Sequence, residues 1–208
     1  MRFSLTYSDD DFIEFEGKRF RLTLYFDRVI AMQSVISDEG LEVSDAEKLA
    51  VFLLCEGAEN LRDEQYSRLL ARICREHLKG DENKGNSKRL FDFEQDAEHI
   101  YSSFLMDYGI DLREQRGKLL WKDFLALFKG LSEKTKMREI MSIRSRDIPT
   151  PTKYNQEEIK ALTKLKRFYA LKDDEVRGES FAEGLAGLAE ILKRNAVVKG
   201  GIKKNGRK

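Results

Sequence analysis

Apolar and polar residues alternate along the first 25 residues of the chain, and this pattern predicts β-strands. A period of two is expected of strands with one buried face. The alternating apolar positions fall in three runs, which are Phe3, Leu5 and Tyr7, then Ile13 and Phe15, then Phe20, Leu22 and Leu24. Glu16-Gly17-Lys18 can form a tight hairpin, in which glycine supplies a positive φ. Because a sheet of two or three short strands needs a covered apolar face, the following segments should dock on it.

Helical spacing replaces the alternation after residue 25. Phe26, Val29 and Ile30 predict a first helix. Ser44 with Glu47 predicts a capping box ahead of an apolar helical segment from Lys48 to Cys55, which Gly57 ends. A third helix is predicted from Asp63 to Lys79, with a core face of Tyr66, Leu69, Leu70, Ile73 and Leu78. Residues 1–79 should therefore form a hairpin packed by helices.

Residues 80–88 contain no apolar side chain and two glycines, which is typical of an exposed loop. We therefore predict a linker over residues 80–90 and a second, helical region over residues 91–172. Its first helix should run from Phe93 to Tyr108 and end at Gly109. The apolar positions of this helix are Phe93, Ala97, Ile100, Tyr101, Phe104, Leu105 and Tyr108.

The same pattern recurs in the next helix of this region. Its apolar positions are Trp121, Phe124, Leu125 and Phe128, and Gly130 follows. A new helix cap is predicted at Ser132, and so short a turn should make the two helices neighbours in space. The following segment carries Met137, Ile140 and Met141 and should break before Pro149.

Two further helices are predicted toward the end of the chain. Asn155 with Glu158 should cap the first, whose apolar positions are Ile159, Leu162, Leu165, Phe168 and Tyr169. The second should span Ser180 to Asn195, with Phe181, Leu185, Leu188, Ile191 and Leu192 at helical spacing. Gly184 and Gly187 each weaken that helix by about 1 kcal/mol relative to alanine. Residues 173–208 are thus predicted to form a C-terminal helix and a flexible basic tail, and the whole chain to be α+β but mostly α-helical.

Composition agrees with a helical protein and argues against a membrane protein. Charged residues make up 36% of the 208 residues, and the only two prolines, Pro149 and Pro151, leave long segments free to be helical. No apolar run approaches the roughly 18 residues of a membrane span, and the N-terminus lacks the apolar core of a signal peptide. We therefore expect a protein of the cytoplasm, in which Cys55 and Cys74 are reduced core residues.

The small net charge of +1 hides a basic end of the chain. From residue 193 onward there are bases and no acids, namely Lys193, Arg194, Lys199, Lys203, Lys204, Arg207 and Lys208. Seven phosphate contacts would give nucleic-acid binding a salt slope of roughly −6. However, no aromatic residues are interleaved with these bases to stack on nucleotides. The alternative is therefore that the chain is a nucleic-acid-binding or regulatory protein that uses this basic tail. The simpler interpretation of the tail is that it is a solubilising terminus.

The sequence contains no recognisable active site, cofactor motif or metal site. Cys74 and His77 could share one helical face with Cys55 and His99 nearby, but their spacing differs from that of zinc sites. The acidic positions Asp92, Glu94, Asp96 and Glu98 are typical of a solvated face at a helix N-terminus, where negative charge is favourable. We therefore predict no enzyme activity, no cofactor and no bound metal.

The aromatic residues of the central region are the candidates for protein–protein contacts. Most should lie in the core, but Trp121 combines a large apolar ring with a polar N–H, a combination common at interfaces. The candidate partner-binding residues are Trp121, Phe124, Phe128 and Tyr108.

One region of the chain resembles a known family. The matching words are Asp92-Phe93-Glu94 with Asp96-Ala97-Glu98, Ile100-Tyr101 with Phe104, Tyr108-Gly109-Ile110-Asp111-Leu112, Trp121 with Phe124, and Ile143-Arg144. They resemble the phage and prophage gene-product-fifteen family, which is associated with long non-contractile tails. The resemblance implies a non-enzymatic tail-assembly-chaperone-like protein in the bacterial host cytoplasm. It also implies the tape-measure protein as a partner, tail-tube subunits as further partners, and self-association along the tape measure.

Overall fold

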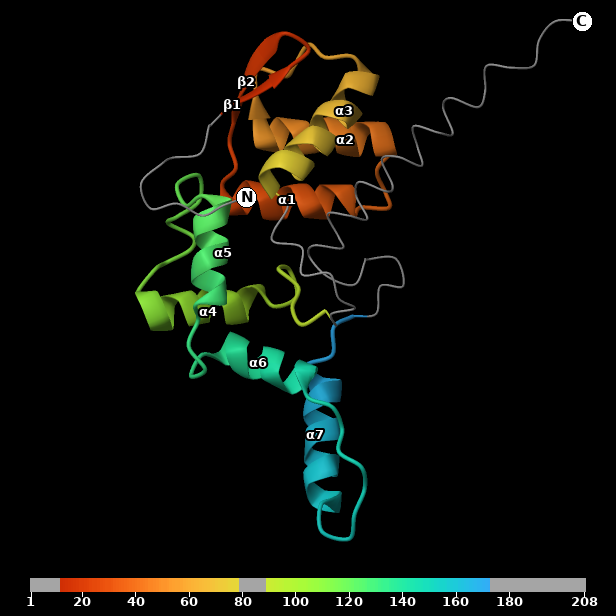
Figure 1. Ribbon diagram of the computed structural model, residues 1–208, viewed down its shortest axis with the longest axis vertical. Helices are drawn as coiled ribbons and strands as arrows, with labels where there is room; N and C mark the ends of the chain where they lie inside the picture. Colours follow the sequence, from red (N-terminus) through yellow and green to blue (C-terminus); the bar gives the residue numbers. More distant parts are fainter. Residues whose placement is uncertain (1–11, 79–88, 173–208) are drawn as a thin grey trace, which may run out of the picture. The chain divides into compact units, whose positions relative to one another are not determined.

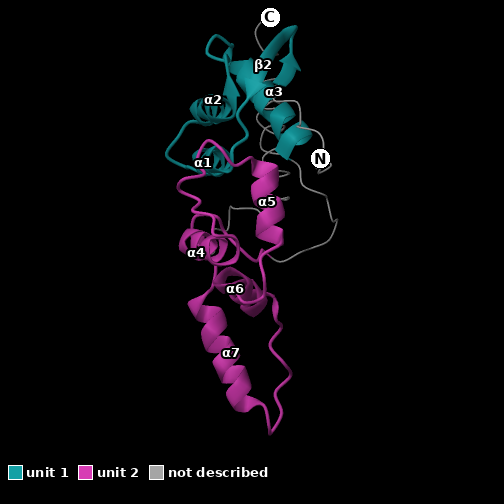
Figure 2. Ribbon diagram, turned by 90° about the vertical axis from the view of Figure 1, so that its left-hand side faces the viewer, with its two compact units in different colours: residues 1–87, 177–208 teal, residues 88–176 magenta. Residues whose placement is uncertain are grey.

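The chain is mostly helical, with one small antiparallel sheet. The computed structural model describes residues 12–78 and 89–172, and these ranges contain a three-stranded sheet in the order β1-β2-β3 and seven α-helices (Figure 1). They fall into two compact units, 12–78 and 89–172 (Figure 2). The predicted fold class is therefore confirmed. The predicted strand at Phe3–Tyr7, the linker core and the C-terminal segment lie outside the described residues.

The first unit begins with the predicted hairpin. Strands β1 (Phe12–Phe15) and β2 (Lys18–Leu22) pair with Ile13 opposite Phe20. Glu16 has φ 49° and Gly17 φ 76°, the two positive values of a two-residue hairpin turn whose twist matches that of the strands. Arg68 pairs with the Glu16 carboxylate at 2.6 Å. This ion pair ties the turn to a helix.

The third strand was not predicted. The helix α2 (Val43–Leu54) was expected to continue through Cys55, but Cys55 and Glu56 form the short strand β3, which pairs with β2. Thr23 reinforces this junction, because its N–H donates to Leu54 O at 2.9 Å and its Oγ1 donates to Leu53 O at 3.1 Å. Gly57, with φ 85°, follows the strand and turns the chain.

The core of the first unit lies between the sheet and its helices. These are α1 (Phe26–Ile36), α2 and α3 (Asp63–Ile73), and a π-helical turn η1 (Cys74–Leu78) extends α3. Helix α2 packs against both α1 and α3. The largest fully buried side chains of this core are Val29, Met32, Leu54, Tyr66, Leu69, Leu70, Ile73 and Leu78.

The capping box predicted at Ser44 and Glu47 is wrong. Helix α2 begins at Val43 with Glu42 as its N-cap, two residues before the predicted cap. Glu47 is buried and accepts a hydrogen bond from Ser67 Oγ at 3.1 Å. This hydrogen bond links α2 to α3.

The second unit contains four helices. They are α4 (Ala97–Tyr108), α5 (Trp121–Lys129), α6 (Lys136–Ser145) and α7 (Gln156–Phe168). Helix α4 was expected to begin near Phe93, but the Asp92 carboxylate accepts hydrogen bonds from the N–H groups of Glu94 and Gln95 and holds a turn there. The end of α4 is as predicted, because Gly109 has φ 65° and Ile110 N–H donates back to Phe104 O at 3.4 Å.

Two predicted helix starts in this unit need correction. Thr135, and not Ser132, is the N-cap of α6, because Ser132 donates through both its N–H and its Oγ to the Asp107 carboxylate on α4. Helices α5 and α6 each pack against α4. Asn155 is the N-cap residue of α7, but its side chain bonds to Thr152 N–H and Thr150 O and makes no capping box with Glu158.

Candidate functional site

The aromatic residues predicted to bind a partner form the core of the second unit. The Phe124 ring stacks on Phe104 with centroids 5.1 Å apart and on Trp121 at 5.5 Å. Phe93 meets Trp121 edge-on at 5.5 Å. Trp121, Phe124 and Phe128 are all buried. A partner could reach these three side chains only if the unit rearranged.

Tyr108, the fourth candidate, links α4 to the end of α5. It is half-buried, and its hydroxyl donates a hydrogen bond to Leu127 O at 2.9 Å. Burial, followed by the negative charge of Asp107, raises the pKa of the phenol above its ordinary value. The hydroxyl therefore keeps its proton, and its hydrogen bond, over the whole physiological range. The basic tail residues lie outside the described residues.

A buried ion pair stands where the sequence predicted a solvated acidic face. Arg144, near the end of α6, donates from Nη1 to Asp96 Oδ2 at 2.6 Å and from Nη2 to Asp96 Oδ1 at 2.8 Å. The side chains are only 6% and 3% exposed. Such a two-pronged contact is the strongest geometry that arginine and a carboxylate can adopt. The prediction of a solvated face is wrong for Asp96, which is the N-cap residue of α4.

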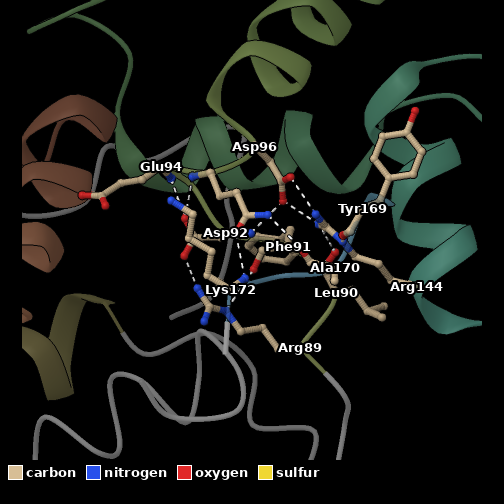
Figure 3. A network of polar contacts seen from close by, with 11 residues as sticks. Arg89, Leu90, Phe91, Asp92, Glu94, Asp96, Arg144, Tyr169, Ala170 and Lys172 are labelled. Atoms are coloured by element: carbon tan, nitrogen blue, oxygen red, sulfur yellow. Dashed lines mark hydrogen bonds and ion pairs between the residues drawn. The ribbon is translucent and has the colours of Figure 1, made fainter. Parts of the chain in front are cut away.

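The same guanidinium binds backbone from two distant segments (Figure 3). Its Nε donates to Tyr169 O at 2.7 Å, and its Nη1 also donates to Leu90 O at 2.9 Å. Gln95 adds two bonds, from its Nε2 to Ala170 O at 2.8 Å and from Lys172 N–H to its Oε1 at 3.0 Å. Arg89 pairs with the Asp92 carboxylate. We call this set the polar clasp, and its side chains are Arg89, Asp92, Gln95, Asp96 and Arg144. It holds the first and last described segments of the second unit together.

The polar clasp has a structural character. Four of the five guanidinium donor directions are used on protein acceptors, and the Asp96 carboxylate also accepts from Asp92 N–H at 2.9 Å. Among residues 12–78 and 89–172, no three His, Cys, Asp or Glu side chains are grouped so as to hold a metal ion. The contacts of Arg144 fix chain segments in place.

A sequence signal for the clasp was available. Arg144 follows Met137 by seven residues, so it continues the apolar stripe of α6 where a leucine would ordinarily stand. A charged residue on a buried face needs a buried partner of opposite sign. Both partners, Asp96 and Arg144, also belong to the words that carry the family resemblance.

Helix α7 carries a row of exposed apolar side chains. Leu162 is its one buried residue. Ala161 is exposed, Leu165 is 42% exposed and Phe168 is 77% exposed. Their spacing of four and three places them on one side of the helix, next to Leu162. We call Ala161, Leu165 and Phe168 the α7 stripe.

Smaller exposed apolar groups occur elsewhere. In the loop before α7, Ile148 is 51% and Tyr154 is 98% exposed. On α4, Leu105 and Met106 are exposed side by side, and in the first unit Leu49 and Phe52 of α2 are about half exposed. Among these exposed apolar groups, the α7 stripe combines regular helical spacing with an aromatic ring that is 77% exposed. It is the candidate interaction surface.

The fold and this surface define a mostly helical protein whose second unit exposes one face of a helix. No described helix is long and apolar enough to cross a membrane. Over residues 8–171 the chain matches the family described as bacteriophage Gp15 protein, and because this match covers most of its length, the chain belongs to that family. The resemblance seen in the sequence is thus confirmed at the level of the family. Comparisons with curated proteins and with solved structures gave no match.

Proposed function

We propose that this phage protein is a non-enzymatic tail-assembly chaperone that binds the tape-measure protein and keeps it soluble while the long non-contractile tail is built. Family membership supports a phage role, and the observation that carries the proposal is the α7 stripe. A tape measure is a long, largely helical chain whose apolar seams would aggregate before the tail tube encloses them. An amphipathic helix can lay its apolar face against such a stripe.

Several copies binding along one tape measure would gain from repeated weak sites. Self-association on the tape measure and contacts to tail-tube subunits belong to the same proposal. The host cytoplasm, where tails are assembled, is the expected place of action.

The test is co-expression of the full chain with the tape-measure protein of the same phage, followed by size exclusion with light scattering at high salt. We expect a soluble complex with several copies of this chain per tape measure. The variant Leu165→Glu/Phe168→Glu should lose at least about tenfold in affinity, since two charges would be buried in an apolar contact. Both side chains are substantially exposed in the free protein, so the variant should remain folded.

The matched control is Lys160→Ala/Arg167→Ala. These two exposed side chains lie on another side of α7, and their removal changes the net charge by the same amount. This control should bind like the unmodified chain. An aggregated tape measure beside a free chain would reject the proposal, and binding that disappears only as salt rises would point instead to the basic tail and to nucleic acid.

A further inference from the structure

Helix α2 of the first unit also exposes one face. Glu42, Asp45, Leu49 and Phe52 follow one another at spacings of three, four and three residues, so they lie along one side of the helix. All four are exposed, Leu49 by 43% and Phe52 by 41%. We call these four residues the α2 face. It combines two acidic residues at the start of the helix with two large apolar residues near its end.

We propose that the α2 face of one copy binds the α7 stripe of a second copy of this chain when no tape measure is present. The contact joins two different surfaces, so a copy that uses one of them still offers the other. Such heterologous contacts build rings or open strings and not twofold dimers. The inference rests on the proposed function only for its role in tail assembly, because the contact itself requires no tape measure.

The apolar residues of the two surfaces match in size and spacing. Leu49 and Phe52 are three residues apart, and Leu165 and Phe168 have the same order and the same spacing. Reversing one helix keeps a spacing of three, and it sets each leucine beside the phenylalanine of the other pair. The Phe168 ring is 77% exposed and the other three side chains are each exposed by more than 40%. The contact therefore removes apolar surface of both copies from water, which is favourable.

Charge sets the direction in which the two helices run. Asp45 lies in the first turn of α2. Helix α7 carries Glu157 and Glu158 in its first turn, and Lys166 and Arg167 in its last turn. An antiparallel pair brings the acidic start of α2 close to the basic end of α7, whereas a parallel pair would bring the two acidic ends together. The antiparallel direction is therefore the favoured one.

This complementarity favours a second copy over an unrelated partner. Every copy presents both surfaces, and they agree in apolar spacing and differ in the sign of their charge. While the contact is formed, the α7 stripe is covered, so a tape-measure helix has to compete for it. Self-association thus shields the stripe until the tape measure is present.

Sedimentation equilibrium of the full chain, without any partner, tests the contact. The average mass of the unmodified chain should rise with concentration past that of a dimer. Leu49→Glu and Leu165→Glu each place a charge in the apolar contact, so each should weaken the association at least about tenfold. The matched control is Leu105→Glu, at a 46% exposed position of α4 that belongs to neither surface, and it should associate like the unmodified chain.

Mixing the two variants tests whether two different surfaces meet. The Leu165→Glu chain keeps an intact α2 face, and the Leu49→Glu chain keeps an intact α7 stripe. An equimolar mixture should therefore form a one-to-one heterodimer and grow no further. A mixture or an unmodified chain that stays monomeric would overturn the proposal. Undiminished self-association of Leu49→Glu alone would overturn it too, in favour of pairing between two α7 helices.

A second variant of the α2 face leaves its apolar residues, and the edge-on contact of Phe52 with Tyr66, in place. Asp45→Lys changes an exposed side chain and puts a base near the basic end of α7. It should weaken the association about threefold at low salt, and by less as salt rises. An unchanged or stronger association would overturn the antiparallel contact. Circular dichroism should show the same helix content in this variant and in the unmodified chain.

Tape-measure binding separates this inference from the proposed function. Leu49→Glu keeps the α7 stripe and removes its competitor, so it should bind the tape-measure protein at least as tightly as the unmodified chain. If it binds no tape measure although the unmodified chain self-associates, the proposed function fails and the contact between copies stands. Tape-measure binding by an unmodified chain that never self-associates would do the reverse.

Discussion

Individual side chains decide how the second unit closes. Arg144 and Asp96 are nearly completely buried and together contact segments at both ends of the unit. Removing one partner of such a pair leaves an uncompensated charge in the interior, whereas removing both costs much less. The clasp is therefore a point at which one substitution should have a large effect.

We expect Arg144→Met to lower the free energy of unfolding of the second unit by about 3–5 kcal/mol. Trp121 is the single tryptophan of the chain and is buried in this unit, so its fluorescence during urea unfolding reports the change. Arg146→Met, at an exposed position two residues away, should change the value by less than about 0.5 kcal/mol. The double variant Asp96→Leu/Arg144→Met should be more stable than Arg144→Met alone, and the opposite order would exclude a strongly coupled pair.

Cys74 should make the stability of the first unit depend on alkaline pH. Burial raises the pKa of this thiol from 9.0 to about 12. Because the folded-state pKa lies above the unfolded value, the contribution of the neutral thiol is complete below pH 9 and is lost as the pH rises from there toward 12.

Between pH 8 and pH 10, the Cys74 contribution to the free energy of unfolding should fall by roughly 1 kcal/mol. Urea unfolding followed by circular dichroism would measure it. Cys74→Ala should show a decrease smaller by that amount, and equal slopes in the two proteins would mean that the thiol is not protected.

At the scale of elements, the same amphipathic pattern has two different outcomes. Helices α4 and α5 bury their aromatic faces against each other and against Phe93. Helix α7, with an equally clear pattern, buries Leu162 and exposes Leu165 and Phe168. Spacing indicates that a helix has an apolar face, but it does not indicate which chain covers that face.

The end of α4 offers a clean test of a local requirement. Gly109 has φ 65°, and a Cβ placed on it would meet no atom within 4 Å. Gly109→Ala should therefore lower the free energy of unfolding by about 1–2 kcal/mol through backbone strain alone. Gly109→Asn should lose clearly less, since asparagine accepts the left-handed conformation more readily. Thermal unfolding followed by Trp121 fluorescence would compare them, and equal losses would show that the cost is not conformational.

At the scale of the whole molecule, the two units differ in the apolar side chains that they expose. The first ties its hairpin to α3 through Arg68 and, over residues 12–78, exposes scattered apolar side chains, while the second exposes the α7 stripe. The predicted boundary at residues 80–90 and the predicted C-terminal segment remain predictions. In the proposed function, the second unit makes the contact with the tape measure through the α7 stripe.

Local features of the structure followed from the sequence alone. The period of two predicted β1 and β2, Glu16 and Gly17 predicted their turn, and Gly109 predicted the end of α4. These features depend on neighbouring residues, whose steric and hydrogen-bonding preferences act within a few positions of the chain. The words around Asp96, Trp121 and Arg144 likewise led to the family.

Only the tertiary structure decided which residues that are far apart in the sequence contact each other. It placed Cys55 and Glu56 in the sheet, turned Ser132 toward Asp107 instead of its own helix, and buried Asp96 against Arg144. It also placed Trp121 in the core and left Phe168 in solvent. In each case, packing and desolvation between segments tens of residues apart determine which contact the side chain makes. A local sequence pattern does not contain that information.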